Sequence, residues 1–232
     1  MARRNIRHHK DIVAIHAASG APSDRCLARL AALGPAVHEP LRDILLGIYV
    51  PPKGSRQGPM ATVAAAVALS ACGAVAVVPD MLRMLRRIDR IGGLNFAIIR
   101  ALQDMGPDAL EPTLAAFDAA EDSLDRQQFG LVLAGLGVDD PRVGAAIARV
   151  IEDNASVGAT IARRYRIEGL ADALGEALDA FEVRLGAARF HNQAVLDIAE
   201  ALEAQGGVLT PGQALKVAAA RDAMDNGFET EP

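Results

Sequence analysis

Glycine recurs along this chain at a spacing close to the length of two short helices. Six glycines, separated by 31 to 39 residues, each lie between two stretches whose apolar residues follow a helical period: Gly34, Gly73, Gly106, Gly137, Gly169 and Gly206. Apolar residues at helical spacing indicate amphipathic helices, and glycine is the residue that most easily turns the chain between them. A fixed period of this length indicates an array in which each repeat is one helix pair.

Proline marks the start of the second helix in these repeats. Four prolines follow a turn closely: Pro35, Pro107, Pro141 and Pro211. Proline is favoured at the first position of a helix, where its missing N–H would have no helical partner. Three further prolines, Pro40, Pro79 and Pro112, each lie six residues after a turn glycine. We expect a proline this far in to bend the second helix or to delay its regular start.

The pattern divides the chain into three parts. Residues 1–22 form a basic tail and an entry helix over 11–18, residues 23–224 form the repeat array, and residues 225–232 form a disordered tail. Ser23 is expected to cap the first helix of the array, and Thr210 and Gln213 to form a capping box at the last one. The predicted helix pairs are 24–33 with 36–48, 60–72 with 74–91, 94–105 with 107–120, 123–136 with 140–153, 155–168 with 170–185, and 187–205 with 211–224.

Two stretches carry a resemblance to a known family. Residues 30–41, LAALGPAVHEPL, and residues 102–117, LQDMGPDALEPTLAAF, share a helix end, a Gly-Pro turn and a proline-containing second helix. This form resembles HEAT repeats, particularly the short bacterial kind also seen in phycobilisome lyases. The resemblance implies an all-α fold, a right-handed α-solenoid of about six antiparallel helix pairs whose second helices line a concave face. An irregular helical bundle is the alternative.

Composition agrees with closely packed helices in a reducing compartment. Hydrophobic residues make up 51% of the chain and aromatic residues only 3%. The two cysteines, Cys26 and Cys72, lie in apolar helical patterns, so we expect buried free thiols and a cytoplasmic protein. The resemblance to short HEAT repeats implies a bacterial one. Residues 60–78 carry no charge, but they are rich in alanine and contain the turn at Gly73, which favours a buried hairpin over a membrane span.

Catalytic motifs of HEAT-like enzymes are weakly represented. Deoxyhypusine hydroxylases are HEAT-like enzymes that hold a di-iron centre with several His-Glu dipeptides. This chain has a single His-Glu dipeptide, at His38 and Glu39. No motif for a nucleophilic triad, a phosphate loop or a metalloprotease is present. We therefore predict no catalytic residue, no cofactor and no metal. The alternative of a HEAT-like enzyme or accessory enzyme of lyase, hydroxylase or DNA-repair type, acting on a bound macromolecule, stays open.

Charge is distributed unevenly along the chain. Residues 1–104 hold 14 Lys and Arg against 7 Asp and Glu, net +7, whereas residues 105–232 hold 10 against 22, net −12. Helical spacing places four arginines on one face of the predicted helix 74–91: Arg83, Arg86, Arg87 and Arg90. They can complement the negative end of their own helix. They can also form a binding patch for an acidic surface.

The predicted loop over residues 49–59 is the longest irregular stretch of the array. Lys53 and Arg56 lie in it among glycine and proline, and Tyr49 at its start gives a faint hint of nucleic-acid stacking. Long loops in compact domains are usually functional or disordered. We expect this loop to be the first site of limited proteolysis and a contact for a partner.

The function predicted from these features is a non-catalytic scaffold or adaptor that binds proteins on a concave helical surface. The partner would carry an acidic surface, and a second copy of the chain, docked head to tail, would also fit. Nucleic acid is disfavoured by the net charge of −5 and the scarcity of aromatic residues, and no membrane association is expected.

Overall fold

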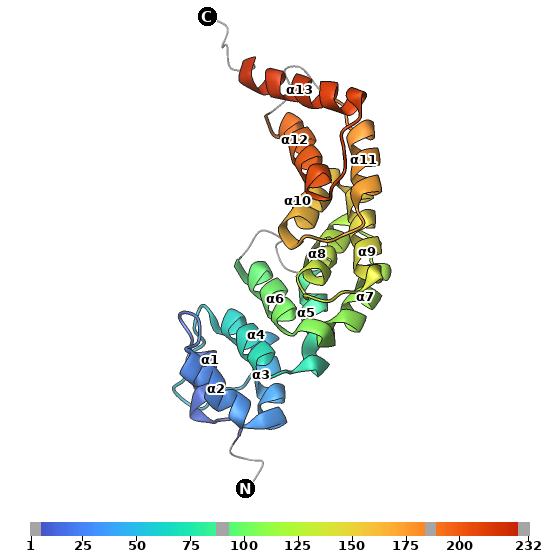
Figure 1. Cartoon of the computed structure of the whole chain (residues 1–232). Helices are drawn as coiled ribbons and strands as arrows, with labels where there is room; N and C mark the ends of the chain where they lie inside the picture. Colours follow the sequence, from blue (N-terminus) through green and yellow to red (C-terminus); the bar gives the residue numbers. More distant parts are fainter. Residues whose placement is uncertain (1–5, 87–92, 184–188, 227–232) are drawn as a thin grey trace, which may run out of the picture. The chain divides into compact units, whose positions relative to one another are not determined.

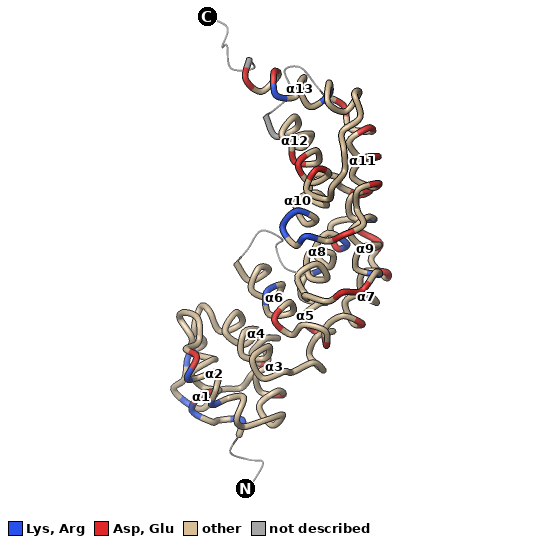
Figure 2. The backbone as a smooth tube through the Cα atoms, in the orientation of Figure 1, with Lys and Arg blue, Asp and Glu red and all other residues tan. Residues whose placement is uncertain are grey.

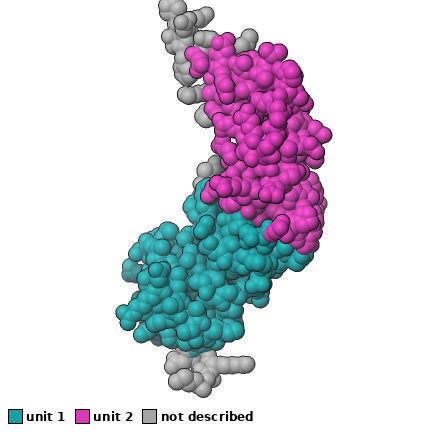
Figure 3. Space-filling model, in the orientation of Figure 1, with its two compact units in different colours: residues 1–116, 135–138 teal, residues 117–134, 139–232 magenta. Residues whose placement is uncertain are grey.

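The computed structural model describes residues 6–86, 93–183 and 189–226, and within them all regular structure is helical (Figure 1). The chain divides into two compact units, coloured separately in Figure 3. Unit 1 comprises residues 1–116 and 135–138, and unit 2 comprises residues 117–134 and 139–232. The helix α7, Leu110–Asp118, contributes to both.

In its described residues, unit 1 contains six further α-helices and three short 3-10 helices. The α-helices are α1 Lys10–His16, α2 Asp24–Ala32, α3 His38–Leu45, α4 Ala61–Ala71, α5 Val78–Leu85 and α6 Gly93–Asp104. The 3-10 helices are η1 Gly34–Val37, η2 Val75–Val77 and η3 Gly106–Ala109.

Unit 2 contains the other six α-helices of the part of the chain that the structure describes. They are α8 Ser123–Ala134, α9 Pro141–Asp153, α10 Ala155–Tyr165, α11 Ala171–Ala180, α12 Arg189–Ala204 and α13 Pro211–Asn226.

All six predicted turn glycines adopt a left-handed backbone. Their φ angles lie between 61° and 77°, a range that glycine adopts without the steric cost of a side chain. The predicted turns at Gly34 and Gly106 are confirmed, and each begins a 3-10 helix, η1 or η3. The regular α-helix starts only afterwards, at His38 and Leu110, so the second proline of the repeat, Pro40 or Pro112, falls in its first turn. The paired prolines therefore delay the regular start of the second helix and do not bend a long helix.

Two predicted helix caps are present. The Ser23 hydroxyl accepts a hydrogen bond from the backbone N–H of Cys26 at 3.4 Å. At the start of α13, the Gln213 N–H donates to the Thr210 hydroxyl at 3.3 Å, and the Thr210 N–H donates to the Gln213 side-chain oxygen at 3.0 Å. This reciprocal pair is the capping box expected from the sequence.

Consecutive helices pack on one another inside each unit. In unit 1, α4 contacts α2, α3 and α6, and in unit 2, α10 contacts α8, α9 and α12, while α9 contacts α11. Leu102, Leu114 and Phe117, apolar residues of the stretch around Gly106, are buried. These contacts establish an all-helical fold of neighbouring helices, and the continuous solenoid over residues 23–224 stays a prediction.

Several helices end earlier than predicted. The helix α3 ends at Leu45, because Gly47 turns the chain with a φ of 72°, and α11 ends at Ala180, where Phe181 takes an extended backbone. The predicted extension of α5 to residue 91 falls largely on residues 87–92, which lie outside the described residues. In the part of the chain that the structure describes, no helix is long and apolar enough to cross a membrane.

Candidate functional site

A buried carboxylate holds two arginines together in unit 1. Asp80, in the first turn of α5, is 4% exposed and accepts hydrogen bonds from Arg42 of α3 and from Arg83 of its own helix. The hydrogen bond from Arg42 lowers the pKa of Asp80 below its usual value, against the opposing effect of burial, and Arg83 adds to the lowering. The carboxylate is therefore charged near neutral pH and positions both guanidinium groups.

These two guanidinium groups remain accessible on their outer sides. The side chain of Arg42 is 42% exposed and that of Arg83 is 66% exposed. Asp80 offsets one of the two positive charges, Asp43 and Glu39 of α3 act on Arg42 more weakly, and a guanidinium has five N–H donors. The Arg42–Asp80–Arg83 cluster, here called the arginine cluster, can therefore accept a further carboxylate from outside. Sequence reasoning identified Arg83 but missed Arg42, which lies on a different helix.

The other arginines of the predicted face have different surroundings. Arg86 is exposed and donates to the backbone oxygen of Ala116, in the last turn of α7, at 3.2 Å. Carbonyls in the last turn of a helix lack helical partners, so this contact helps to satisfy one of them. Arg87 and Arg90 lie outside the described residues. Within unit 1, Arg83 thus joins the arginine cluster, whereas Arg86 docks on α7.

The loop over residues 49–59 is fastened at both ends and exposed in its middle. The buried Tyr49 donates its hydroxyl to the backbone oxygen of Arg7 at 2.6 Å, and the Gly58 N–H donates to the backbone oxygen of His16 at 2.9 Å. Lys53 and Arg56, between these anchors, are exposed. The anchors join the loop to α1 and the segment before it, whereas Arg83 contacts Asp80 of its own helix α5 and Arg86 contacts α7.

Burial of Tyr49 also bears on its predicted role. Its ring lies 5.1 Å from the ring of His16, centroid to centroid, and is 7% exposed. Desolvation lowers the pKa of His16 and raises the pKa of Tyr49. A ring packed in this way cannot stack on a base, so the hint of nucleic-acid binding at Tyr49 was wrong.

The single His-Glu dipeptide is engaged in contacts within unit 1. His38 places Nε2 3.2 Å from the backbone oxygen of Cys72, and Glu39 lies 3.9 Å from the Arg7 guanidinium. Among the described residues, no group of three or more His, Cys, Asp or Glu side chains is arranged to hold a metal ion.

Both cysteines are free, as expected, but only one is buried. Cys26 is buried and Cys72 is half-buried. Burial raises the pKa of both thiols, and the nearby carboxylate of Asp11 adds to the effect at Cys26. Near neutral pH both therefore stay largely in the less reactive thiol form.

Unit 2 contains a partly apolar cavity that sequence reasoning did not identify. This cavity, here called the α9–α11 cavity, has a volume of about 580 Å³ and lies between the end of α9, the start of α10 and one side of α11. Its apolar lining is Ile151, Ala155, Ala173, Ala177, Ala180 and Phe181, and its polar lining is Glu152, Asp153, Asn154 and Glu176.

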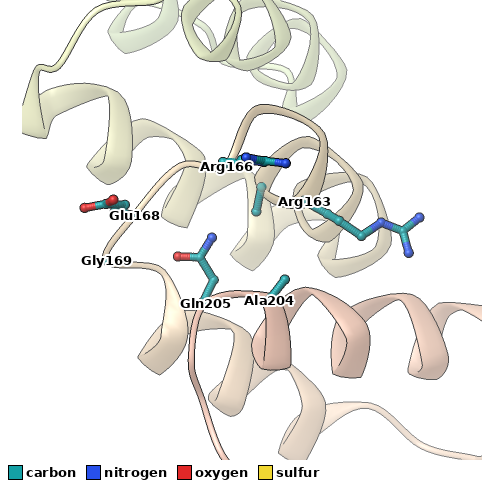
Figure 4. A pocket seen from close by; sticks show the side chains of 7 residues that line it. Arg163, Arg166, Glu168, Gly169, Ala204 and Gln205 are labelled. Atoms are coloured by element: carbon teal, nitrogen blue, oxygen red, sulfur yellow. The ribbon is translucent and has the colours of Figure 1, made fainter.

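A second, more polar cavity lies at the turn between α10 and α11 (Figure 4). Its volume is about 780 Å³, and Figure 4 shows the Gln205 side chain extending from the end of α12 toward the turn that carries Arg166. Arg166 has a left-handed backbone, with a φ of 53°, at the end of α10. Arg163 forms an ion pair with Glu200 of α12, and Glu168 also lines the cavity, so charges of both signs meet here.

The sequence contains a signal for the acidic residues beside the α9–α11 cavity but not for the cavity itself. Asp172, Glu176 and Asp179 follow helical spacing on α11, as the arginines do on α5, and could have been identified as an acidic face. The cavity beside them depends on where Ala155 and Ile151 come to lie, which a single helix pattern does not reveal.

The chain matches no model of a known protein family, no curated protein and no solved structure in the comparisons made. Its likeness to HEAT repeats therefore rests on the residue pattern alone.

Proposed function

We propose that the protein is a non-catalytic scaffold or adaptor of the bacterial cytoplasm, built from HEAT-like helix pairs, and that its unit 1 binds an acidic surface of a partner protein. The observation that carries this proposal is the arginine cluster. Asp80 fixes two guanidinium groups from neighbouring second helices while leaving both of them partly exposed. Preorganised donors lose less conformational entropy on binding than free side chains do.

The net charges of the two units also favour binding of an acidic partner by unit 1. Unit 1 contains 14 Lys and Arg and 9 Asp and Glu, net +5, whereas unit 2 contains 10 and 20, net −10. A basic surface steers acidic partners toward it, and this attraction weakens with salt beyond a screening length of about 8 Å at physiological ionic strength. The opposite net charges of the two units also allow a second copy of the chain to serve as the acidic partner, head to tail.

Arg86, Lys53 and Arg56 are auxiliary contacts in this proposal. All three are exposed, and their positive charge adds to the field of unit 1. Arg87 and Arg90 are also proposed to contact the acidic partner, on the basis of their helical spacing in the sequence.

Co-purification from a native host tests this function. The bait proteins are the wild-type chain, the double variant Arg83→Gln/Arg86→Gln and the control double variant Arg25→Gln/Arg100→Gln, which removes the same charge from exposed positions on α2 and α6. Glutamine is used because a glutamate at position 83 would stand beside the buried Asp80.

We expect specific proteins to be enriched with the wild-type chain and the control, and to be lost with Arg83→Gln/Arg86→Gln and at high salt. Sedimentation velocity of the purified chain shows whether a second copy is among the partners. Equal capture by all three baits would contradict the assignment of the arginines.

A further inference from the structure

The lining of the α9–α11 cavity leaves room for a large apolar side chain. Four alanines from α10 and α11 stand where longer side chains would fill the space: Ala155, Ala173, Ala177 and Ala180. Ile151 and the half-buried Phe181 complete an apolar wall. The volume of about 580 Å³ is within the usual range of ligand pockets. An apolar anchor residue of a peptide can therefore be buried here.

The polar lining is acidic. Glu152 and Glu176 are exposed at the cavity and form no ion pair with any described residue. Asp153 differs, because Arg126 neutralises it through hydrogen bonds of 2.6 and 2.8 Å. Two carboxylates with uncompensated charge thus lie beside the apolar wall.

Helix ends and neighbouring residues strengthen the negative potential. The cavity is lined by the last residues of α9 and of α11, where the helix dipole places partial negative charge, and by the start of α10, where it places partial positive charge, so two of the three helix ends add to the negative potential. Asp172 and Asp179 lie one turn on either side of Glu176, and Figure 2 shows acidic positions along α11. The unit as a whole has a net charge of −10, which favours a cationic ligand.

We propose that the α9–α11 cavity binds a short basic segment of a partner protein, with one apolar anchor residue buried against the alanines and Phe181, and with Lys or Arg side chains paired to Glu152 and Glu176. The aliphatic stems of Lys and Arg can pack along the apolar wall while their charged ends reach the carboxylates. The proposal concerns another unit and the opposite partner charge from the arginine cluster, so it does not depend on the proposed function.

Fluorescence anisotropy with three labelled peptides of twelve residues tests this proposal on the full chain. The first probe has a central Leu-Leu pair flanked by Lys and Arg, the second has the same pair flanked by Glu, and the third keeps Lys and Arg but replaces leucine with serine. The protein variants are Glu152→Gln/Glu176→Gln, Ala177→Leu, and the control Asp139→Asn/Glu203→Gln. The control removes two exposed carboxylates of unit 2 that do not line the cavity.

We expect only the first probe to bind the wild-type chain and the control well. Glu152→Gln/Glu176→Gln should weaken this binding about tenfold or more through the loss of charge, and Ala177→Leu should weaken it by filling the cavity. Methyl NMR of alanine-labelled protein should show shifts at Ala155, Ala173 and Ala177 when the first probe is added.

Equal binding of the serine probe would mean that attraction by net charge alone is responsible, which would overturn the proposal. Unchanged affinity in Glu152→Gln/Glu176→Gln, or methyl shifts confined to alanines elsewhere, would also overturn it. The charge variant changes exposed side chains, so it keeps the test decisive if Ala177→Leu fails to fold.

Discussion

A methyl group at position 158 should separate α9 from α10. A Cβ built on Gly158 would lie 2.7 Å from the Cα and 2.8 Å from the backbone nitrogen of Ile151. Backbone atoms cannot rotate away as a side chain can, so Gly158→Ala requires the two helices to shift. Replacing glycine with alanine inside an exposed helix normally gains about 1 kcal/mol. Overpacking that shifts the backbone costs about 1–3 kcal/mol, so after the gain of about 1 kcal/mol we expect a net loss of up to about 2 kcal/mol.

The matched control is Gly175→Ala on α11. There the nearest atom to the new Cβ is Nε2 of Gln213, at 3.9 Å, so the normal helix gain of about 0.5–1 kcal/mol should appear. Urea unfolding followed by circular dichroism measures both variants against the wild-type chain. A Gly158→Ala variant as stable as Gly175→Ala would refute the close approach of α9 and α10, and with it the described wall of the α9–α11 cavity.

Three further predictions concern Asp80, Gln128 and the loop over residues 49–59. The pKa of Asp80 is lowered in the folded chain, so on acidification the unfolded chain takes up the proton first. The stabilisation that the Asp80 carboxylate gives to the fold is therefore complete above the unfolded pKa of about 3.9 and is lost as pH falls through the folded pKa. Asp80→Asn should therefore have a lower free energy of unfolding than the wild-type chain near pH 7, and this difference should narrow below about pH 4. Urea unfolding at a series of pH values measures it, and the exposed control Asp104→Asn should differ less from the wild-type chain near pH 7. Both polar atoms of the Gln128 amide are buried without a hydrogen-bond partner in the described part of the chain, so Gln128→Met should raise the free energy of unfolding by about 1–3 kcal/mol, and an effect no larger than that of Gln127→Met would contradict this. Trypsin should cut after Lys53 or Arg56 before it cuts inside the described helices, as peptide mapping by mass spectrometry will show, and early cuts inside α4 or α10 instead would mean that the loop is protected.

Local patterns predicted the helices well because they depend on neighbours in sequence. A turn glycine, the proline after it and a capping residue act within a few positions, so the turn at Gly106 and the capping box at Thr210 were both confirmed. Helix ends were less accurate. The sequence does not show that Gly47 would adopt a left-handed backbone and end α3 early.

The interaction surfaces were predicted less completely because they combine residues from different helices. The spacing of Arg83 and Arg86 gave one face of α5, but it did not show that Arg42 approaches Asp80 from α3 or that Arg86 meets Ala116 of α7. Tyr49 illustrates the same limit. It was assigned to an irregular loop, yet the packing of α1 buries its ring.

Hydrogen–deuterium exchange of the full chain, with and without a co-purified partner, tests most directly where an acidic partner binds. The account predicts protection of backbone amides in α3 and α5, around Arg42, Arg83 and Arg86, and loss of that protection in Arg83→Gln/Arg86→Gln. Protection confined to other helices, with α3 and α5 unchanged and the variant behaving like the wild-type chain, would contradict the arginine cluster as the binding surface.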